Sequence, residues 1–484
     1  MESPCINNRK KFALNNLLKN PVRTIAGLIV ISGLLSIPLA ASAEYNYGET
    51  GSNWMSYISN SAPLSQLTIP GTHESSSADG GVFPSEAQCQ DENIAQQLAD
   101  GTRYFDFRCE NQGHGLPDAL AMYHGDFYEG SYLDTSLASI YTFLAAHPTE
   151  TVLVSFLETD TSTGSAFADD ISDYIQANES YWYFGNTTPT LGSVRGKIVL
   201  FNRYGTQSNG QTIGIDCLGW EDNVSFCNAG SANYNGGPNV YVQDLYNPPG
   251  GINSGTVEAN KWTAISQQIT NAWGDNNMNN FYFNNLSIAW ELPDTQSIEG
   301  YAQAMNGDIE PNCTGVYSPH RYGVIYVDWS NSTIAADIYR LNDGPFSQAA
   351  HQFVNANSGL VLDGTLNTYN GALVDQYHNV SATQEYWTLY PLGGGLYEIA
   401  NDYSGNALDI AGGSKSNGGA IDTYGWATSI NEEFYLSPDT YGTYEIVSLL
   451  DGNVVEIGGN AKSNGAPADQ WSWAGTASQR WTVK

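Results

Sequence analysis

The segment SLASIYTFLAAHPTETVLVSFLE, residues 136–158, contains a predicted helix followed closely by a predicted strand. Apolar residues recur at helical spacing through its first half, SLASIYTFLAAHP, at 136–148. Its second half includes TVLVSFLE at 151–158, a short apolar run that is typical of a buried strand. This order of elements predicts one unit of an α/β fold.

Five further apolar runs of strand length lie between residues 44 and 342. They are RYFDFR (103–108), KIVLFNRY (197–204), NVYVQDLY (239–246), FYFNNLSIAW (281–290) and GVIYVDW (323–329). Strands separated by helices imply right-handed crossovers and a mostly parallel sheet. A stretch of roughly 300 residues with this pattern suits a closed TIM-like barrel, whose functional residues lie at the carboxyl ends of the strands.

The run LTIPGTHESSS, residues 67–77, adds an opening strand that carries a histidine. Leu67 and Ile69 alternate with a polar residue as in a half-buried strand, and Pro70 and Gly71 predict a turn that ends it. His73 would then lie at the mouth of that strand.

From about residue 347 the sequence repeats itself three times. Asp375, Asp422 and Asp469 recur with a period of 47 residues, and Trp387, Phe434 and Trp481 recur with the same period. Repeats of this length predict three small β units that share one core. Residues 347–484 resemble the ricin-type β-trefoil lectins in having an early Asp, an aromatic residue about fourteen positions later and a QxW-like end, and this resemblance implies an all-β trefoil.

Charge and targeting signals restrict the partners and the location. The chain has 17 Lys and Arg against 50 Asp and Glu, and a formal net charge of −33. Residues 1–43 combine a basic start, an apolar run and Ala41-Ser42-Ala43, which predicts a cleaved signal peptide and a secreted protein, with an uncleaved membrane anchor as the alternative. So acidic a chain excludes nucleic acid as a partner, because binding to phosphates needs a basic face.

The cysteines allow two disulfides in an oxidising compartment. Cys217 with Cys227 would close a short loop, Cys89 with Cys109 would tie a helix to the next strand, and Cys313 is left over. No Cys/His cluster has the spacing of a zinc site.

Polar residues at predicted strand ends supply the parts of a phosphodiester-cleaving site. They are His73, Arg108, His124, Arg203 and Asp328. One histidine takes a proton from the attacking hydroxyl, the other gives a proton to the leaving oxygen, and guanidinium groups neutralise the phosphate. A carboxylate on the first histidine fixes its tautomer and raises its basicity. Taken singly, Arg108 also reads as an ion pair with Asp106, His124 as a structural residue and Asp328 as a strand-end cap.

The ordered motifs LTIPGTHES, GTRYFDFR, YHGDFYEG, ETVLVSF, RGKIVLFNRYG, VQDLYN and GVIYVDW resemble the X-domain family of phosphatidylinositol-specific phospholipases C, above all its secreted bacterial type. The resemblance implies an irregular (β/α)8 barrel over 44–342. It also implies that His73 is the general base, His124 the general acid and Asp328 the partner of His73. Arg108 would bind the phosphate; the residues implied to hold the inositol are Arg203, Asp244 and Tyr246.

Two positions depart from the bacterial pattern. Glu74 stands where those enzymes usually carry Asp, and it counts among the expected catalytic residues. Leu157 stands where the bacterial relatives carry Lys. Arg108 stands where the calcium-dependent branch has a metal-binding Asp, so we expect no metal and no cofactor.

The lectin resemblance implies sugar sites in two repeats. Repeat two supplies Asp409, Tyr424 and Asn431, and repeat one supplies Asp363, Tyr377 and Gln384. Repeat three has Glu456, Trp471 and Ser478, whose short side chain leaves a sugar hydroxyl unmet. The alternative is that all three repeats only build the trefoil core.

Together these features predict a secreted phosphodiesterase that cleaves phosphatidylinositol, or a glycosylated derivative, at a membrane surface. The products would be diacylglycerol and inositol 1,2-cyclic phosphate, and the lectin domain would bind galactose-like glycans. The main alternative is a catalytically silent lectin or toxin-like protein. A glycerophosphodiesterase or sphingomyelinase-D-like barrel is a third interpretation, but such enzymes need acidic metal-binding clusters, and here only Glu74, Asp106 and Glu158 are near.

Overall fold

The computed structural model describes residues 50–78, 87–113, 115–160, 163–230, 237–275, 277–289, 296–309, 321–342, 346, 349–393, 395–438 and 442–484. The predicted signal peptide and Cys313 lie outside these residues.

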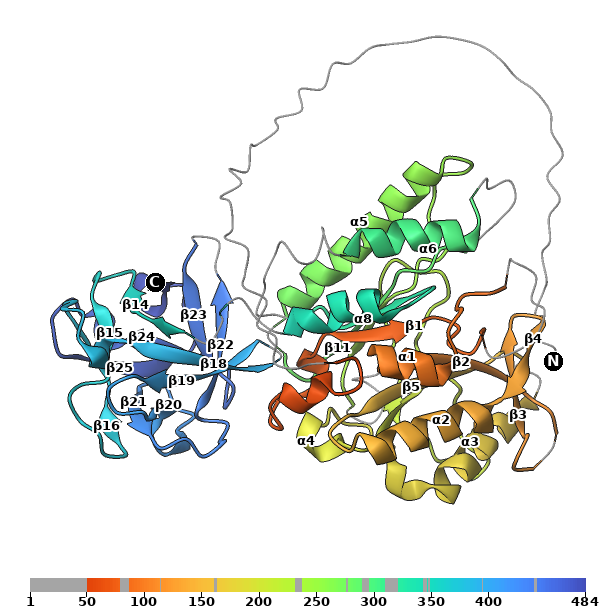
Figure 1. Cartoon of the computed structure of the whole chain (residues 1–484), viewed down its shortest axis with the longest axis horizontal. Helices are drawn as coiled ribbons and strands as arrows, with labels where there is room; N and C mark the ends of the chain where they lie inside the picture. Colours follow the sequence, from red (N-terminus) through yellow and green to blue (C-terminus); the bar gives the residue numbers. More distant parts are fainter. Residues whose placement is uncertain are drawn as a thin grey trace, which may run out of the picture. The chain divides into compact units, whose positions relative to one another are not determined.

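The first part of the chain is built on a parallel sheet (Figure 1). Its parallel strands pair in the order β6, β7, β5, β2, β1, β12, β11, β10. Their bounds are Trp182–Tyr183 (β6), Ile198–Asn202 (β7), Val152–Glu158 (β5), Tyr104–Asn111 (β2), Ile69–Thr72 (β1), Val324–Val327 (β12), Phe281–Asn285 (β11) and Val240–Gln243 (β10). The six apolar runs predicted to be strands are all strands, and the parallel sheet is confirmed.

Helices alternate with these strands. They are α1 (Ile94–Asp100), α2 (Leu133–Ala146), α3 (Ala166–Ala177), α4 (Leu191–Val194), α5 (Ser254–Trp273), α6 (Ile298–Gly307) and α8 (Ser332–Tyr339). Three begin at an Asn whose side chain caps the first turn: Asn93, Asn253 and Asn331. The antiparallel hairpin of β3 (Leu120–His124) and β4 (Phe127–Tyr132) extends from β2.

The strand pairings trace an open path within the described part of the chain. At one end β8 (Ile215–Asp216) pairs with β7, and at the other β9 (Cys227–Asn228) pairs antiparallel with β10. No pairing between described residues joins these two ends. The sequence predicts a closed barrel. Among the described residues the strands instead form a sheet whose two edges do not pair with each other.

The turn predicted at Pro70 and Gly71 is wrong, because both residues lie inside β1. Pro70 accepts from the backbone N–H of Arg103 through its carbonyl, so it takes part in the sheet despite lacking a donor. A Cβ on Gly71 would come within 2.6 Å of the Tyr104 ring and 2.9 Å of the Tyr326 Cβ. Gly71 therefore marks close packing of neighbouring strands, which a sequence pattern cannot distinguish from a turn.

Side chains alternate between the two faces of the sheet. This alternation separates two cores and sets the direction of the side chains at the strand ends. In β2, Tyr104 packs in one core, whereas Phe105 and Phe107 pack in the other, against helices α1 to α3. Val199 and Phe201 of β7, Val240 and Val242 of β10, and Val324 and Tyr326 of β12 belong to the same core as Tyr104. Because successive side chains alternate, the polar residues that lie two positions further on point to the same side of the sheet.

The second part of the chain contains short antiparallel strands and no α-helix among its described residues (Figure 1). The strands are β13 (Ala350–His351), β14 (Phe353–Asn355), β15 (Val361–Asp363), β16 (Ala372–Leu373), β17 (Asp375–Tyr377), β18 (Trp387–Gly393), β19 (Leu396–Asn401), β20 (Ala407–Ile410), β21 (Gly419–Tyr424), β22 (Glu433–Pro438), β23 (Tyr444–Ser448), β24 (Val454–Ile457), β25 (Ala466–Trp471) and β26 (Trp481–Val483). The repeated aromatics Trp387, Phe434 and Trp481 are fully buried in one shared core, as the repeat pattern predicts.

The predicted disulfides are absent from the described residues. Cys89, Cys109, Cys217 and Cys227 are all buried free thiols. Cys109 lies in the core with its sulfur 3.5 Å from that of Met122, whereas the Cys89 sulfur lies beside His124. The expectation from cysteine spacing thus fails for this pair because alternation along β2 turns Cys109 toward the helices.

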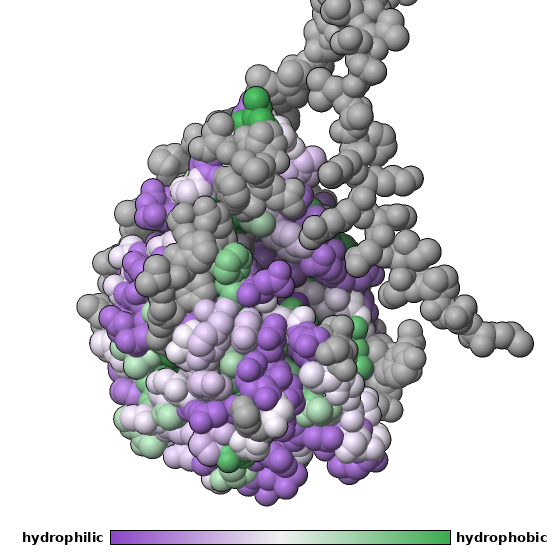
Figure 2. Space-filling view, turned by 90° about the vertical axis from the view of Figure 1, so that its right-hand side faces the viewer, coloured by the Kyte–Doolittle hydropathy of each residue, from purple (hydrophilic) through white to green (hydrophobic). Residues whose placement is uncertain are grey.

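The next feature is the polarity of the surface. The face seen in Figure 2 is mostly hydrophilic, with separate hydrophobic residues scattered over it. Within the described ranges no helix is both long enough and apolar enough to cross a membrane.

Candidate active site

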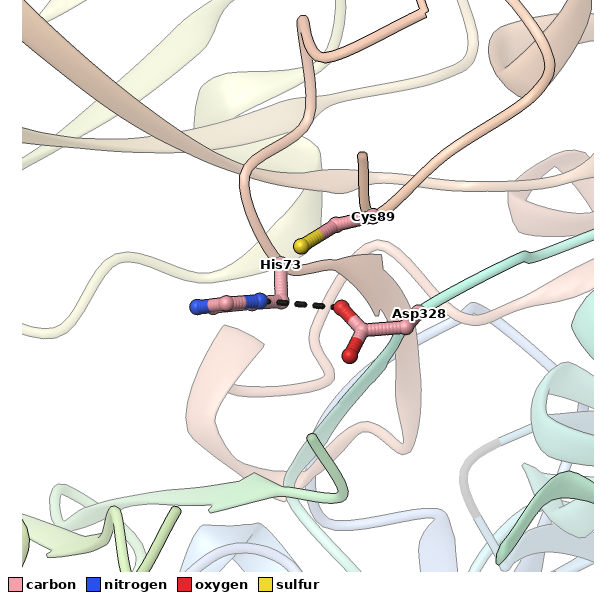
Figure 3. A group of neighbouring side chains, drawn as sticks. All are labelled: His73, Cys89 and Asp328. Atoms are coloured by element: carbon pink, nitrogen blue, oxygen red, sulfur yellow. Dashed lines mark hydrogen bonds and ion pairs between the residues drawn. The ribbon is translucent and has the colours of Figure 1, made fainter. Parts of the chain in front are cut away.

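A buried histidine and a buried carboxylate meet at the ends of β1 and β12. His73 follows β1, and its Nδ1 lies 2.9 Å from Oδ1 of Asp328, the residue after β12 (Figure 3). Both residues are buried, His73 being 7% exposed and Asp328 2%. The pair brings together two residues 255 positions apart, as the sequence predicts.

The contacts of His73 identify its tautomer. Nη2 of Arg108 donates to Nε2 of His73 over 2.8 Å, and because a guanidinium has only donors, Nε2 is unprotonated. The remaining proton is on Nδ1 and faces Asp328. Although burial opposes protonation, the charge of Asp328 leaves the pKa of His73 raised above its ordinary value. His73 is therefore arranged to accept a proton at Nε2 and to be stabilised once charged.

Arg108 is held by three neighbours. Its Nη1 lies 2.8 Å from Oε1 of Glu74, its Nε lies 3.2 Å from Oδ2 of Asp106, and its Nη2 contacts His73. The ion pair with Asp106 considered from the sequence is thus present together with the contact to His73. Glu74 is buried and has a φ of 43°, a left-handed conformation that costs of order 1 kcal/mol in a non-glycine residue. This backbone conformation and the ion pair together place the Glu74 carboxylate under the guanidinium.

His124 ends β3 and lies beside His73. The two rings are nearly perpendicular, with centroids 6.2 Å apart. Nδ1 of His124 donates to the Ala87 carbonyl over 2.6 Å, so Nε2 is the atom that can exchange a proton. That Nε2 lies 3.8 Å from Oε1 of Glu74. The two histidines therefore lie side by side, with Arg108 on one and Glu74 next to the other.

Asp106 joins Arg108 to the second arginine. Its Oδ1 lies 3.0 Å from Nη1 of Arg203, and it also accepts from the Ser155 hydroxyl over 3.2 Å. Although burial opposes its ionisation, the two guanidinium groups lower the pKa of Asp106 to about 2. The Arg203 guanidinium lies 3.9 Å from the centroid of the Trp220 ring. Asp106 thus carries a permanent negative charge that fixes both arginines.

The carboxylate of Asp244 continues this network. Nε1 of Trp220 donates to Oδ2 of Asp244 over 2.8 Å, and the Asn285 amide donates to Oδ1 over 2.7 Å. The hydroxyl of Tyr246, two residues further on, donates to Asp222 over 2.9 Å. The predicted inositol-binding residues Arg203 and Asp244 are therefore brought together through Trp220, while Tyr246 is held by a separate exposed carboxylate.

Sequence reasoning missed four residues of this site. Asp106, two positions before Arg108 on the same face of β2, was recognisable from strand alternation but had been considered only as an ion-pair partner. Trp220, Asn285 and Cys89 lie outside the recognised motifs, and their proximity follows only from the folded chain. His73, Cys89 and Asp328 have ligand atoms within 4.8 Å of one another.

With this geometry established, comparisons identify the relatives of the chain. Residues 60–204 match the family described as phosphatidylinositol-specific phospholipase C, X domain. These residues are therefore similar to an X domain of this family. It is 29% identical over 317 residues to the 1-phosphatidylinositol phosphodiesterase of Staphylococcus aureus strain NCTC 8325, a match that covers 63% of this chain and 91% of the relative. The corresponding enzyme of Listeria monocytogenes is 27% identical over 309 residues, covering 60% of this chain and 86% of the relative.

Solved structures agree with this assignment. A structure of the phosphatidylinositol-specific phospholipase C from S. aureus superposes with a TM-score of 0.52 at 27% identity, covering 61% of this chain and 98% of that one. The X-domain match contains His73, Arg108, His124 and Arg203. Asp244 and Asp328 lie beyond the matched residues, but the structure joins them to the same network.

The strand-rich part matches a second family. Residues 338–424 and 430–484 match the ricin-type β-trefoil lectin domain-like family. In its second repeat, the Asn431 amide donates to the Asp409 carboxylate. Tyr424 ends β21 and is 44% exposed. This places an open aromatic ring on the strand that pairs with the one carrying Asp409.

The other repeats resemble the second to different degrees. In repeat one, Gln384 hydrogen-bonds to Asp363, and Tyr377 at the end of β17 is 39% exposed. In repeat three the Ser478 hydroxyl is buried and pairs with Thr476 over 2.9 Å instead of reaching Glu456. An amide–carboxylate contact is therefore present in repeats one and two, and repeat three has a Ser–Thr contact in its place.

Proposed function

We propose that this X domain cleaves phosphatidylinositol, or a glycosylated derivative of it, to diacylglycerol and inositol 1,2-cyclic phosphate. The observation that supports this most directly is the side-by-side arrangement of His73 and His124, with Asp328 on the first ring and Arg108 beside it. Phosphodiester cleavage needs a base, an acid and a fixed cation, and this group supplies all three.

In the proposed reaction His73 removes the proton of the inositol 2-hydroxyl through Nε2. The hydroxyl oxygen bonds to phosphorus, the bond from phosphorus to the diacylglycerol oxygen breaks, and His124 protonates that leaving oxygen from its own Nε2. The Asp328 carboxylate stabilises the charge that develops on His73. The transferable proton of His124 is on Nε2, because Nδ1 already donates to the Ala87 carbonyl.

Arg108 has to change partners during this cycle. Its Nη2 donates to the same lone pair of His73 that must accept the substrate proton. A bound phosphate carries a full negative charge and accepts bidentate hydrogen bonds from a guanidinium, so it draws Arg108 away from His73. Substrate binding would therefore release the general base, while Glu74 keeps Arg108 within reach of the phosphate.

The permanent cation of Arg108 also supports a metal-independent mechanism. A guanidinium next to the base can neutralise the phosphate without a coordination shell. Arg203 and Asp244, joined through Trp220, offer a donor and an acceptor for vicinal inositol hydroxyls. We therefore assign phosphate binding to Arg108 and inositol binding to Arg203, Asp244 and Tyr246.

For the strand-rich part we propose carbohydrate binding by a β-trefoil, best in repeat two. A carboxylate oriented by an amide, next to an exposed aromatic ring, is the usual chemistry for a galactose-like sugar. The finer assignments belong to the same proposal: an irregular TIM barrel over 44–342, a trefoil over 347–484, and secretion after cleavage of residues 1–43. Together they describe an exported lipase that is retained on glycan-bearing membranes.

Purified chain incubated with vesicles of mixed phospholipids tests the lipid specificity. Mass spectrometry should find diacylglycerol released from phosphatidylinositol and not from phosphatidylcholine or phosphatidylethanolamine. A chain that folds, binds glycans and releases no diacylglycerol would instead support the catalytically silent lectin.

A further inference from the structure

A third side chain lies against the pair of His73 and Asp328. The sulfur of Cys89, one histidine nitrogen and one carboxylate oxygen all lie within 4.8 Å of one another, and all three residues are buried (Figure 3). The same sulfur lies 3.9 Å from Nδ1 of His124. Cys89 thus lies beside both histidines of the proposed reaction without having a part in it.

The site is fixed before any ligand arrives. The backbone N–H of Cys89 donates to the Ser77 hydroxyl over 3.1 Å, and its carbonyl accepts from the Trp329 N–H over 2.7 Å. This second bond ties Cys89 to the residue that follows Asp328. The sulfur is therefore held beside the carboxylate by the backbone of both segments.

One carboxylate oxygen of Asp328 has no hydrogen-bond partner within the part of the chain that the structure describes. Its Oδ1 accepts from His73, but Oδ2 is buried and has no hydrogen-bond partner among the described residues. A buried carboxylate oxygen without a partner is costly, and a cation would satisfy it. Arg108 contacts the other nitrogen of His73 and is surrounded by the carboxylates of Glu74 and Asp106. The buried Lys261 interacts with Asp328 through its charge, but its ammonium donates to Gln243 and to the Leu245 carbonyl.

We propose that His73, Cys89 and Asp328 form an inhibitory site for a thiophilic divalent cation such as Zn²⁺. Imidazole, thiolate and carboxylate are ligands that Zn²⁺ accepts together, whereas Ca²⁺ and Mg²⁺ take oxygen ligands. A tetrahedral zinc centre places such ligand atoms about 3.3 to 3.6 Å apart, so small side-chain movements suffice. The Nδ1 hydrogen bond of His73 opens to admit the metal.

Binding of the cation would stop the reaction by removing its base. The Cys89 thiol releases its proton to solvent when it ligates the metal, and the proton of His73 moves from Nδ1 to Nε2. This proton occupies the lone pair that takes the inositol proton, and Arg108 no longer donates to that nitrogen. His73 then no longer acts as base. The inhibition, but not the binding, rests on the proposed function.

Metal binding and activity are tested on the purified full chain, with Cys227→Ser as control because Cys227 is another buried thiol. Equilibrium dialysis should show one tightly bound Zn²⁺ in wild type and control, and an affinity at least about tenfold lower in Cys89→Ser. With Co²⁺ as probe, wild type and control should show a thiolate-to-cobalt absorption band that Cys89→Ser lacks. Asp328→Asn provides a second variant if Cys89→Ser does not fold.

Cleavage of a soluble inositol phosphodiester completes the test. Zn²⁺ should inhibit wild type at the concentration where dialysis shows binding, and the same concentration should leave the zinc-free rate of Cys89→Ser unchanged. Equal Zn²⁺ affinity in wild type and Cys89→Ser, or a cobalt complex without the thiolate band, would overturn the proposal and assign the metal to surface groups. If the chain lacks activity altogether, the proposed function fails, while dialysis and the cobalt band still decide the site.

Discussion

Replacing Asp328 with Asn removes one charge while keeping the shape of the residue that orients His73. The lost carboxylate oxygen lies 2.9 Å from Nδ1. With an effective dielectric constant of about 20, this charge stabilises an imidazolium by at most about 6 kcal/mol. Net values for hydrogen bonds to charged groups are about 1.5–3 kcal/mol, which corresponds to a roughly 10- to 100-fold fall in kcat.

Because Arg108 contacts His73, we expect the fall in kcat to lie at the lower end of that range. An Asn partner allows two ring tautomers, and the wrong one disables a general base more severely. Here Arg108 donates to Nε2, so Asn at position 328 must present its oxygen to the Nδ1 proton. When the phosphate draws Arg108 away, the inositol 2-hydroxyl replaces it as the donor to Nε2, so the tautomer should survive and only the charge stabilisation should be lost.

Initial rates on phosphatidylinositol in detergent micelles, measured from pH 5 to 9, provide the assay. Asp328 raises the pKa of His73, so Asp328→Asn should move the rise in activity to lower pH as well as reduce the maximum. Asp91→Asn, at an exposed carboxylate, is the control for loss of one charge. A loss smaller than threefold, or an unchanged pH profile, would refute the role of Asp328.

Three other outcomes follow from the same contacts. His124→Ala should lower kcat by about 10² to 10⁴ with an unchanged circular dichroism spectrum, and a rate above half of wild type would exclude it as the acid. Activity should persist in excess EDTA while Arg108→Lys loses most of it, because one ammonium cannot replace three guanidinium contacts; rescue by calcium after EDTA would contradict this. Burial and the neighbouring Asp422 raise the pKa of Asp409 to about 8, so the stability of the strand-rich part should fall as pH rises from about 4 through 8. Hydrogen exchange of β20 and β21 should show this fall, and Asp409→Asn should flatten it.

Strand alternation explains why so much of the active site was predictable. His73, Arg203, Asp244 and Asp328 directly follow buried strands, whereas Arg108 lies within β2, and parallel strands bring their carboxyl ends to one edge. The strand pattern in the sequence therefore predicted that these residues, although far apart in the chain, lie close together. His124 was likewise expected at a strand end, and it ends β3 of the β3–β4 hairpin, whereas Asp244 was named only through the family resemblance.

Other features depended on contacts that no local pattern records. Pro70 and Gly71 read as a turn, although neighbouring rings require a small residue inside the strand. Cys89 and Cys109 read as a disulfide, although their side chains have different surroundings. Trp220 has no motif, and its role between two site residues appears only in the fold.

The identity of the phosphorus product tests the central claim most directly. ³¹P NMR during cleavage of phosphatidylinositol should show inositol 1,2-cyclic phosphate as the first product of the wild-type chain, and no such signal with His73→Ala. Direct formation of inositol 1-phosphate without the cyclic intermediate, or release of phosphatidic acid, would contradict the account of His73 as the base for the 2-hydroxyl.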